Sequence, residues 1–393
     1  MNRNRYSFIK NSRLSLIVVI LLIGVSGILL LVGMKKKPIR IGLAAQLTGK
    51  QAELGVQERN GALLAVETIN VSGGIDGRKI QLVIRDDFGI PEQAKLADRE
   101  LIESGVAAII GHATSEQTLA GLEVTNPANI VMIGATASTP ELSGLDDYFF
   151  RVYPSFKESA QTFAQYIYQQ SGIKRMAIIY DDDNTAYAKT YSAIFTDKFQ
   201  YLGGEIVGEI SFSSVTQPDF QPLLLKLHED NVDGLLIIAS DIDTALIAQR
   251  TCLMGWQIPL FSSHWAQTET LINNGGQAVE GMKMEQSYTF ISQSPTFIDF
   301  QSRYQVRFGN APSFGAALAY DAVMVLREGL EKTEGGSEGL KQALLQIQNF
   351  QGLTDTFSFD EFGDVRRPFS LCSIRNGKFV ILDPFTSNRL GGE

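Results

Sequence analysis

Two apolar runs of this 393-residue sequence end in polar residues that could hold a small molecule. The first run, Ala107–Gly111, has the composition of a strand. Thr114 and Gln117 follow it with the spacing of a capping box, which predicts that a helix begins there. The free backbone amides of its first turn, beside the hydroxyl of Ser115, would attract a carboxylate or another electron-rich group.

The second run, Val131–Ala135, ends in a similar way. Ser138 follows it, and Thr139 before Pro140 has the order of an N-cap and a first helical residue. In open parallel sheets, ligands bind beyond the carboxyl ends of the strands, where the strand order switches. We therefore expect Ser115 and Ser138 to belong to one ligand site. The alternative is that each serine only caps its own helix.

Catalytic chemistry has little support in the sequence. Ser115, His264 and Asp241 can be drawn as a hydrolase triad, but Ser115 does not lie in a Gly-x-Ser-x-Gly elbow. The sequence has neither a phosphate-binding loop nor a His-Glu-x-x-His motif. Asp181–Asp183 could bind a hard cation, but a solvated acidic loop is the simpler interpretation. We therefore expect no enzymatic activity, no cofactor and no metal site.

The composition and charge exclude further classes of protein. Apolar residues make up 44% and charged residues 20%, an ordinary balance for a globular protein. Residues 1–37 hold seven Lys or Arg and no acid, so the other 356 residues carry a net charge of −16. Such an acidic body should repel nucleic acid, because binding requires Lys and Arg on the phosphates. Two cysteines and three histidines give no basis for a disulfide scaffold or a Cys/His metal site.

An uncharged apolar run near the amino terminus predicts membrane attachment. Leu14–Gly33 has 20 residues, which as a helix span about 30 Å, the thickness of a bilayer's hydrocarbon core. No cleavage site directly follows, whereas Lys35–Lys37 supply a charged stop. We expect 14–34 to be a transmembrane anchor or uncleaved signal and 1–13 a short basic cytoplasmic segment. The alternative is a signal peptide that is removed.

From Ile39 onward, strand-like runs alternate with amphipathic helical stretches. Strands are expected at 39–45, 79–85, 107–111, 130–135, 176–180, 205–212, 234–240 and 258–262. Helices are expected at 60–69, 91–104, 158–170, 186–202, 219–230 and 244–254. This alternation implies parallel sheets covered by helices on both faces. Because the series restarts after Pro154, the predicted fold class is α/β, with two doubly wound parallel-sheet lobes.

A series of short motifs occurs in a characteristic order along the chain. It consists of Gln46–Gly49, Gly61–Asn70, Gly73–Arg78, Asp86–Asp87 with Pro91–Ala94, Ala135–Ser138 with Pro140–Leu142, Phe150–Arg151, Ala319–Val323, and Phe359–Asp360 with Gly363–Asp364. In this order the motifs resemble the branched-chain amino-acid (leucine/isoleucine/valine) binding proteins, the type I periplasmic substrate-binding proteins of ABC importers. The resemblance extends from about residue 39 to residue 384.

The resemblance implies two lobes joined by a hinge, each made of separate stretches of chain. Lobe one would contain 39–152 plus 288–350. Lobe two would contain 153–287 plus 351–393. The hinge would be the three crossings between these stretches, and the lobes would close on a ligand.

The resemblance also implies which side chains of lobe one contact the ligand. Ser115 and Ser138 match the family's ligand-binding serine and threonine, and would take a carboxylate. The carbonyl of Thr136 would accept one ammonium proton. Leu54 would add an apolar wall.

The opposite wall in lobe two departs from the family pattern. Tyr187 aligns with the tyrosine that closes over the ligand, and Trp265 would help it to enclose the ligand side chain. The leucine-type receptors carry an acid that holds the ammonium where this chain has His264. Asp241, at a neighbouring strand end, could supply the missing charge. Alternatively, the ligand has no ammonium and is an amide or an organic acid.

These features predict an extracytoplasmic substrate-binding protein of an ABC importer. Its ligand would be a small carboxylate, with a branched-chain or other hydrophobic amino acid as the first candidate. Its partners would be the permease and ATPase subunits and, through the amino-terminal helix, the cell membrane, with the folded body in the periplasm or extracellular space. The alternative is a ligand-sensing module for a separate signalling partner.

Overall fold

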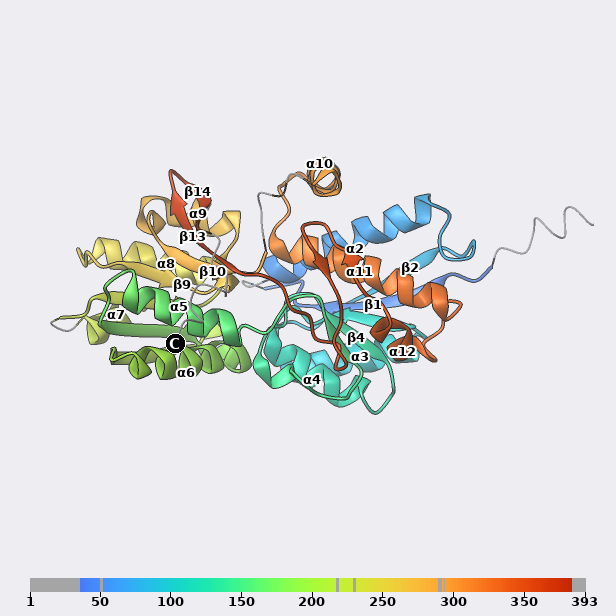
Figure 1. The fold of residues 1–393 in the computed structure, drawn as a ribbon, viewed down its shortest axis with the longest axis horizontal. Helices are drawn as coiled ribbons and strands as arrows, with labels where there is room; N and C mark the ends of the chain where they lie inside the picture. The colour runs from blue at the N-terminus through green and yellow to red at the C-terminus, as the bar shows by residue number, and fades with distance from the viewer. Residues whose placement is uncertain are drawn as a thin grey trace, which may run out of the picture.

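A computed structural model describes most of the chain as two α/β lobes that lie side by side (Figure 1). The described residues are 36–49, 52–216, 219–228, 231–288, 292 and 294–383. Within them, every helix and strand expected between residues 39 and 262 has a counterpart. The expected α/β class with two doubly wound lobes is confirmed.

Lobe one is built on a five-stranded parallel sheet in the order β2-β1-β3-β4-β5. Its strands are β1 (Ile39–Ala45), β2 (Ile80–Asp86), β3 (Ala108–Gly111), β4 (Val131–Gly134) and β5 (Phe149–Arg151). Every residue of β1 except Arg40 is buried, as expected of a parallel strand covered on both faces. The next two strands in sequence, β2 and β3, lie on opposite sides of β1 in the sheet. The strand order therefore switches between β1 and β3, and the loops that follow these two strands diverge and leave room for a ligand.

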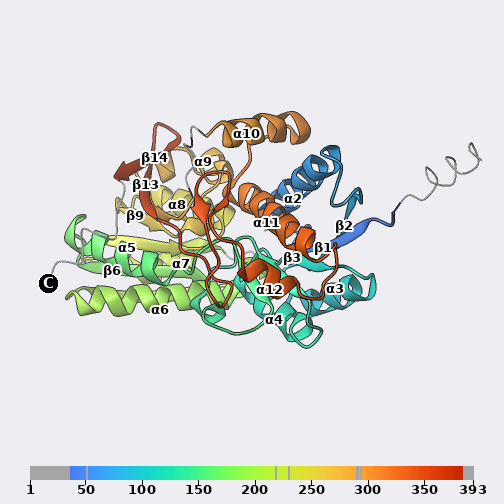
Figure 2. The ribbon, with the colours of Figure 1, turned by 45° about the vertical axis from the view of Figure 1, so that its right-hand side comes forward.

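Helices cover both faces of this sheet, α2 and α11 on one and α3 and α4 on the other (Figure 2). The first pair shares a core with the side chains of Ile41 and Leu43, whereas α3 packs on Ala44 and Ile109. The helices of lobe one are α2 (Glu53–Val71), α3 (Pro91–Glu103), α4 (Ser115–Thr125), α10 (Pro295–Phe308), α11 (Phe314–Lys332) and α12 (Leu340–Leu345).

Lobe two has a seven-stranded sheet in the order β14-β13-β10-β9-β8-β6-β7, in which β13 and β14 are antiparallel to their neighbours. The strands are β6 (Arg175–Asp181), β7 (Glu205–Phe212), β8 (Gly234–Ile238), β9 (Leu260–Ser262), β10 (Lys283–Gln286), β13 (Ser370–Arg375) and β14 (Lys378–Asp383). The helices are α5 (Lys157–Gln169), α6 (Thr185–Tyr201), α7 (Phe220–Leu227), α8 (Asp241–Leu253) and α9 (Glu269–Gly275). Helices α5 and α6 share one core, and α7, α8 and α9 share another on the opposite face.

The third crossing between the lobes lies later in the chain than the expected boundary after residue 350. The hairpin of β11 (Phe350–Gln351) and β12 (Thr356–Phe357) packs on lobe one. Phe359 and Val365 also belong to the lobe-one core, and the chain reaches the lobe-two sheet only at β13. Packing therefore places residues up to Val365 with lobe one.

Helix α2 begins at Glu53, seven residues earlier than predicted. Glycine in a helix interior costs about 1 kcal/mol relative to alanine, and α2 contains two glycines, Gly55 and Gly61. Their role is close approach: a Cβ on Gly61 would lie 1.9 Å from the carbonyl oxygen of Ala316 in α11. A Cβ on Gly55 would lie 2.1 Å from the carbonyl oxygen of Gln46. Both glycines therefore allow contacts that a side chain would prevent.

In the described part of the chain, no helix has both the length and the apolar composition needed to cross a bilayer. The segment expected to be an anchor, 14–34, lies outside the described residues. Membrane attachment therefore stays a prediction.

We predict that Gly61→Ala destabilises the protein, because the new methyl group forces α2 and α11 apart. Overpacking of this kind costs about 1–3 kcal/mol, which thermal or urea unfolding measures. Gly336→Ala is the matched control, since a Cβ there comes no closer than 3.4 Å to its nearest neighbour, the carbonyl oxygen of Thr333. Equal stability of both variants would contradict the close-approach explanation.

Candidate functional site

Loops from both lobes meet at a small cavity at the carboxyl ends of the parallel strands. The lining residues from lobe one are Leu54, Ala113, Thr114, Ser115, Thr136 and Phe314, and those from lobe two are Asn184, Tyr187, His264 and Trp265. The cavity volume is about 20 Å³, space for about one water molecule. This arrangement therefore has no room for a larger molecule.

Six of the eight predicted site residues line this cavity: Leu54, Ser115, Thr136, Tyr187, His264 and Trp265. A seventh, Ser138, is fully buried beside it, with its Oγ 3.5 Å from Nε2 of His264. The structure thus brings together side chains from positions 54 to 265. Their contacts with a ligand stay predictions.

Asp241 does not line the cavity. Its Oδ2 accepts a hydrogen bond of 2.5 Å from Thr268 Oγ1, and its Oδ1 accepts one of 2.8 Å from the amide of Ile242. Asp241 is the first residue of α8, whose N-cap is Ser240, and an acid in a first turn stabilises the helix dipole. In this arrangement the Asp241 carboxylate, predicted to bind a ligand ammonium, is instead bound to Thr268 and to the amide of Ile242.

Ser115 holds the two lobe-one loops together. Its Oγ accepts hydrogen bonds of 3.3 Å from the amides of both Ser138 and Thr139. Thr139 in turn caps the single 3₁₀ turn η1 (Pro140–Leu142), as the sequence predicted, by accepting from the amide of Glu141 at 3.4 Å. The serine thus connects the loop after β3 to the loop after β4.

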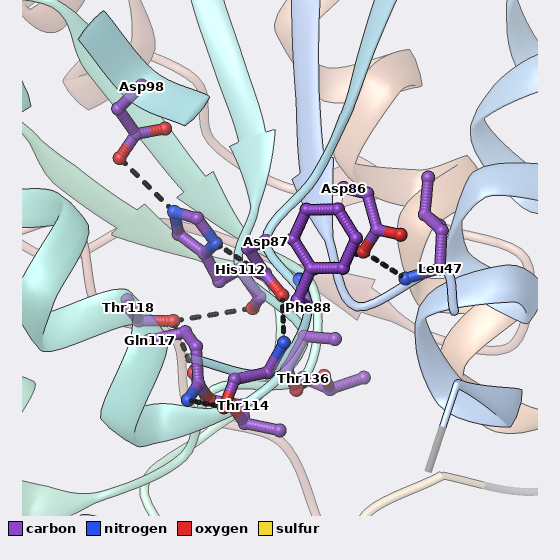
Figure 3. Close-up of polar contacts among 12 residues, drawn as sticks. Leu47, Asp86, Asp87, Phe88, Asp98, His112, Thr114, Gln117, Thr118 and Thr136 are labelled. Atoms are coloured by element: carbon purple, nitrogen blue, oxygen red, sulfur yellow. Dashed lines mark hydrogen bonds and ion pairs between the residues drawn. The ribbon is translucent and has the colours of Figure 1, made fainter. Parts of the chain in front are cut away.

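The predicted capping box at α4 forms only in part. The helix begins at Ser115 with Thr114 in the N-cap position, but the Thr114 side chain makes no capping bond. Gln117 instead donates a 2.8 Å hydrogen bond to the carbonyl of Gly89 (Figure 3). The Thr114 hydroxyl is consequently buried at the cavity without a hydrogen-bond partner.

A buried histidine anchors the loop that carries Thr114 and Ser115 (Figure 3). His112 Nδ1 lies 2.6 Å from Asp87 Oδ2, and its Nε2 lies 3.1 Å from Asp98 Oδ2. Burial on its own lowers the pKa of His112, but the charges of Asp98 and Asp87 and the hydrogen bonds to both outweigh burial and raise the pKa to about 10. His112 is therefore an imidazolium at neutral pH, with both N–H groups bound.

Thr136 is held by a buried acid. Its Oγ1 lies 2.6 Å from Glu58 Oε1 and 2.6 Å from the carbonyl oxygen of Ala113. Burial raises the pKa of Glu58 to about 8, although the hydrogen bond with Thr136 acts in the opposite direction. A hydroxyl has one proton, so a protonated Glu58 that donates to Thr136 while Thr136 donates to Ala113 accounts for both short contacts.

His264, in the 3₁₀ turn η4 (His264–Ala266), is the centre of the lobe-two wall. Its Nδ1 lies 3.1 Å from Oε1 of Glu285 on β10 and 3.3 Å from the hydroxyl of Tyr187. The rings of Tyr153 and Tyr187 lie 5.0 and 5.4 Å from the imidazole, centroid to centroid. The ring is therefore held on several sides.

Hydrogen bonds between helix ends join the two lobes beside the cavity. Asn184, the last residue of η2 (Asp182–Asn184), accepts from the amide of Glu116 at 3.2 Å. The Glu116 carboxylate accepts from the amide of Ala186 at 2.9 Å. Each side chain thus satisfies a free amide at the start of the other lobe's helix, α4 or α6.

The acidic run Asp181–Asp183 has a structural role. Asp183 Oδ2 accepts a 2.8 Å hydrogen bond from the amide of Val215 and a 2.9 Å bond from Ser214 Oγ. Asp181 Oδ2 also accepts from Ser214 Oγ. These contacts fix the turn after β7, and in the described residues no group of three or more potential metal ligands gathers there or elsewhere.

Sequence reasoning did not assign two buried acids behind the cavity or four of its ten lining residues, Ala113, Thr114, Asn184 and Phe314. Glu285 lies in β10, whose sequence Lys-Met-Glu-Gln is mostly polar, so nothing local marks it as buried. Glu58 lies within α2, where nothing local marks it as buried. Phe314 comes from the start of α11, some 200 residues from most of its neighbours in the cavity, so only packing could assign it.

Comparison with known proteins places the chain among solute receptors. The family model described as periplasmic binding protein matches residues 38–378. The Leu/Ile/Val-binding protein homolog 3 of Brucella melitensis is 26% identical over 353 residues, covering 88% of this chain and 94% of that protein.

Two solved structures have the same fold. The leucine binding protein LivK of Thermotoga maritima has a TM-score of 0.81 at 25% identity, covering 90% of this chain and all of that one. The branched-chain amino acid transporter substrate binding protein LivJ of Streptococcus pneumoniae, solved with isoleucine, has a TM-score of 0.81 at 25% identity, covering 88% of this chain and all of that one.

We predict that Glu58→Gln stabilises the protein more at pH 8 than at pH 5. The folded-state pKa of Glu58, about 8, lies above its ordinary value of 4.5. Between these values the unfolded chain releases the proton and the folded chain keeps it, so wild-type stability falls as the pH rises. Glutamine keeps a donor to Thr136 and removes this loss, on the order of 4 kcal/mol at pH 8.

Thermal unfolding of wild type and variant across pH 5–8 measures this difference. Glu67→Gln is the control, because Glu67 lies on the exposed side of the same helix in a surface pair with Arg307. A Glu58→Gln effect that does not change with pH would show that Glu58 is ionised in the folded protein.

We predict that Glu116→Ala favours separation of the lobes. It removes a charge-assisted bond to the amino end of α6, worth about 1–3 kcal/mol to the closed arrangement. Small-angle scattering should show a larger radius of gyration than for wild type. Glu123→Ala is the control, since Glu123 lies on the same helix but pairs with Lys95 within lobe one. Identical scattering from both variants would show that the bond between Glu116 and the amide of Ala186 does not hold the lobes together.

Proposed function

This chain belongs to the periplasmic binding protein family, and on that premise we propose that it is the substrate-binding protein of an ABC importer, holding a small carboxylate-bearing molecule between its lobes. The observation that carries the proposal is the cavity itself, because loops at the strand ends of both lobes line it. A ligand that contacts both walls binds the closed arrangement better than the open one, and can shift the equilibrium only by that difference.

The lobe-one wall supplies the groups that a carboxylate needs. Thr114 has a buried hydroxyl without a partner, and Ser115 lies in the first turn of α4, where backbone amides and the helix dipole favour negative charge. Leu54, Trp265 and Phe314 give the rest of the lining an apolar character. A small acid with an apolar body suits this combination.

The first ligand candidate is the hydrophobic amino acid that the sequence suggested. The relatives named for leucine, isoleucine and valine support that class. The second candidate, an acid or amide without an ammonium, is favoured by one observation: none of the ten described lining residues is an acid.

The proposal includes no chemical step. Ser138, His264 and Glu285 follow one another as a hydrolase triad would, but the Ser138 side chain is fully buried and does not line the cavity. Gly335–Gly339 matches the Gly-x-Ser-x-Gly pattern but forms the turn between α11 and α12, where a hydrolase needs a strand-to-helix elbow. Neither arrangement offers an accessible nucleophile.

An extracytoplasmic location, anchorage at the membrane and delivery to a permease and ATPase belong to the same proposal. A sensing role would use the same cleft and differ only in the partner that reads the closed form. Co-purification from membranes with the products of neighbouring genes separates a permease partner from a signalling partner.

We predict that Thr114→Val weakens ligand binding tenfold or more without destabilising the unliganded protein. Losing one hydrogen bond to a charged ligand group costs about 1.5–3 kcal/mol, whereas removing an unpaired buried hydroxyl is neutral or stabilising. Thr125→Val is the control, because its hydroxyl is also buried and unpartnered but lies outside the cavity lining.

The assay is a thermal-shift screen of amino acids, amides and organic acids, followed by calorimetry on the best ligand. A ligand at 100 times its dissociation constant stabilises the protein by about 2.7 kcal/mol. Equal losses of affinity in both threonine variants would place the ligand away from Thr114. A complete lack of stabilisation by any carboxylate would overturn the proposed function.

A further inference from the structure

We propose that the cleft selects a small organic acid that carries no free amine, and that His264, positioned by Glu285, enforces this choice. The inference rests on the proposed function and names its substrate class. It depends on which atom of His264 carries a hydrogen, and the buried acid behind the ring determines that.

Glu285 is a carboxyl group removed from water. It lies on β10 with no exposed surface, and its Oε1 is 3.1 Å from His264 Nδ1. In the described part of the chain, His264 is the one basic side chain within ion-pair distance of Glu285. A buried carboxylate without compensation costs several kcal/mol, so the pair should be neutral overall.

A neutral pair has two forms, which differ in the position of one proton. In the first, the proton is on Nδ1, and an imidazolium faces a carboxylate. In the second, the proton is on Glu285, and Nδ1 accepts it as a hydrogen bond. In both forms Nε2 carries a hydrogen, because a neutral imidazole has one N–H and an imidazolium has two.

His264 therefore offers the cleft a hydrogen-bond donor. His264 lines the cavity, and its Nε2 lies 3.5 Å from both the Oγ of Ser138 and the hydroxyl of Tyr187. Both distances are long for a hydrogen bond, so the hydrogen on Nε2 stays available to a ligand oxygen. Rotation of the ring is hindered by Tyr153 and Tyr187, with Phe314 at 6.4 Å. A donor held in this position attracts a carboxylate or carbonyl oxygen and repels an ammonium.

The other acids around the cleft are already engaged. The Glu116 carboxylate accepts a hydrogen bond from the amide of Ala186. Asp241 is engaged with Thr268. Glu58 touches Thr136 from behind and stays protonated at neutral pH. An amino acid bound here would leave its ammonium desolvated with carbonyl and hydroxyl oxygens alone, whereas an amine-free acid would avoid that cost.

The test compares pairs of ligands that differ only in the amine: L-leucine with 4-methylpentanoate, and L-phenylalanine with 3-phenylpropanoate. Calorimetry on the purified wild-type protein gives the ratio of the two dissociation constants in each pair. We expect the amine-free acid to bind at least tenfold more tightly. Equal or tighter binding of the amino acid overturns the inference and leaves the proposed function intact. If no member of either pair binds, the inference falls, and the proposed function is then decided by the wider thermal-shift screen of carboxylates.

Variants of His264 and Glu285 test whether these residues cause the preference for amine-free acids. Replacing the donor with an acid, in the double variant His264→Glu with Glu285→Gln, should move the ratio toward the amino acid by tenfold or more. Glu285→Gln alone should reduce the preference, because Nε2 then no longer needs to carry a hydrogen, and a purely structural role would leave the ratio unchanged.

Asp241→Asn tests whether Asp241 compensates a ligand ammonium or whether the preferred ligand has no ammonium. It keeps the size of the side chain and an acceptor for Thr268, and we expect the ratio to stay within twofold of wild type. The inference would be overturned by a large change in the ratio with Asp241→Asn and no change in the His264 and Glu285 variants. That result would show that Asp241 binds the ligand ammonium.

Discussion

Each buried charge beside the cleft must be neutralised inside the protein, because a carboxylate removed from water without a partner costs several kcal/mol. The structure meets this requirement differently in each lobe. His112 is an imidazolium between two aspartates, which fixes the loop after β3. Glu58 stays protonated and holds Thr136. Glu285 lies 3.1 Å from Nδ1 of His264. The polarity of the ligand site follows from these pairings.

A second set of polar contacts joins the two lobes at the free amides where helices begin. Asn184 and Glu116 each satisfy an amide of the other lobe's helix, and Glu141 accepts a 3.0 Å bond from Thr190 nearby. These bonds form only when the strand ends of the lobes face each other. In the proposed mechanism, a ligand that contacts both walls adds to these bonds and so favours the closed arrangement.

The third crossing shows how long-range pairing determines a domain boundary. Arg367 pairs with Asp355 at 2.9 Å and with Asp321 of α11 at 3.5 Å. Together with the aromatic residues Phe357 and Phe359, these pairs keep the chain on lobe one well past residue 350. The crossing therefore begins only after Arg367, immediately before β13.

The sequence by itself determined the alternation of strands and helices, the start of a helix at Ser115 and the strand-end loops that carry most of the cavity, since each depends on patterns within a few residues. Only the tertiary structure decided which acids serve the site. Asp241 looked available but binds Thr268, whereas Glu285 looked unremarkable and stands behind His264. The contacts that matter here join residues 21 to 78 positions apart, and such partners are brought together by packing, which local periodicity does not encode.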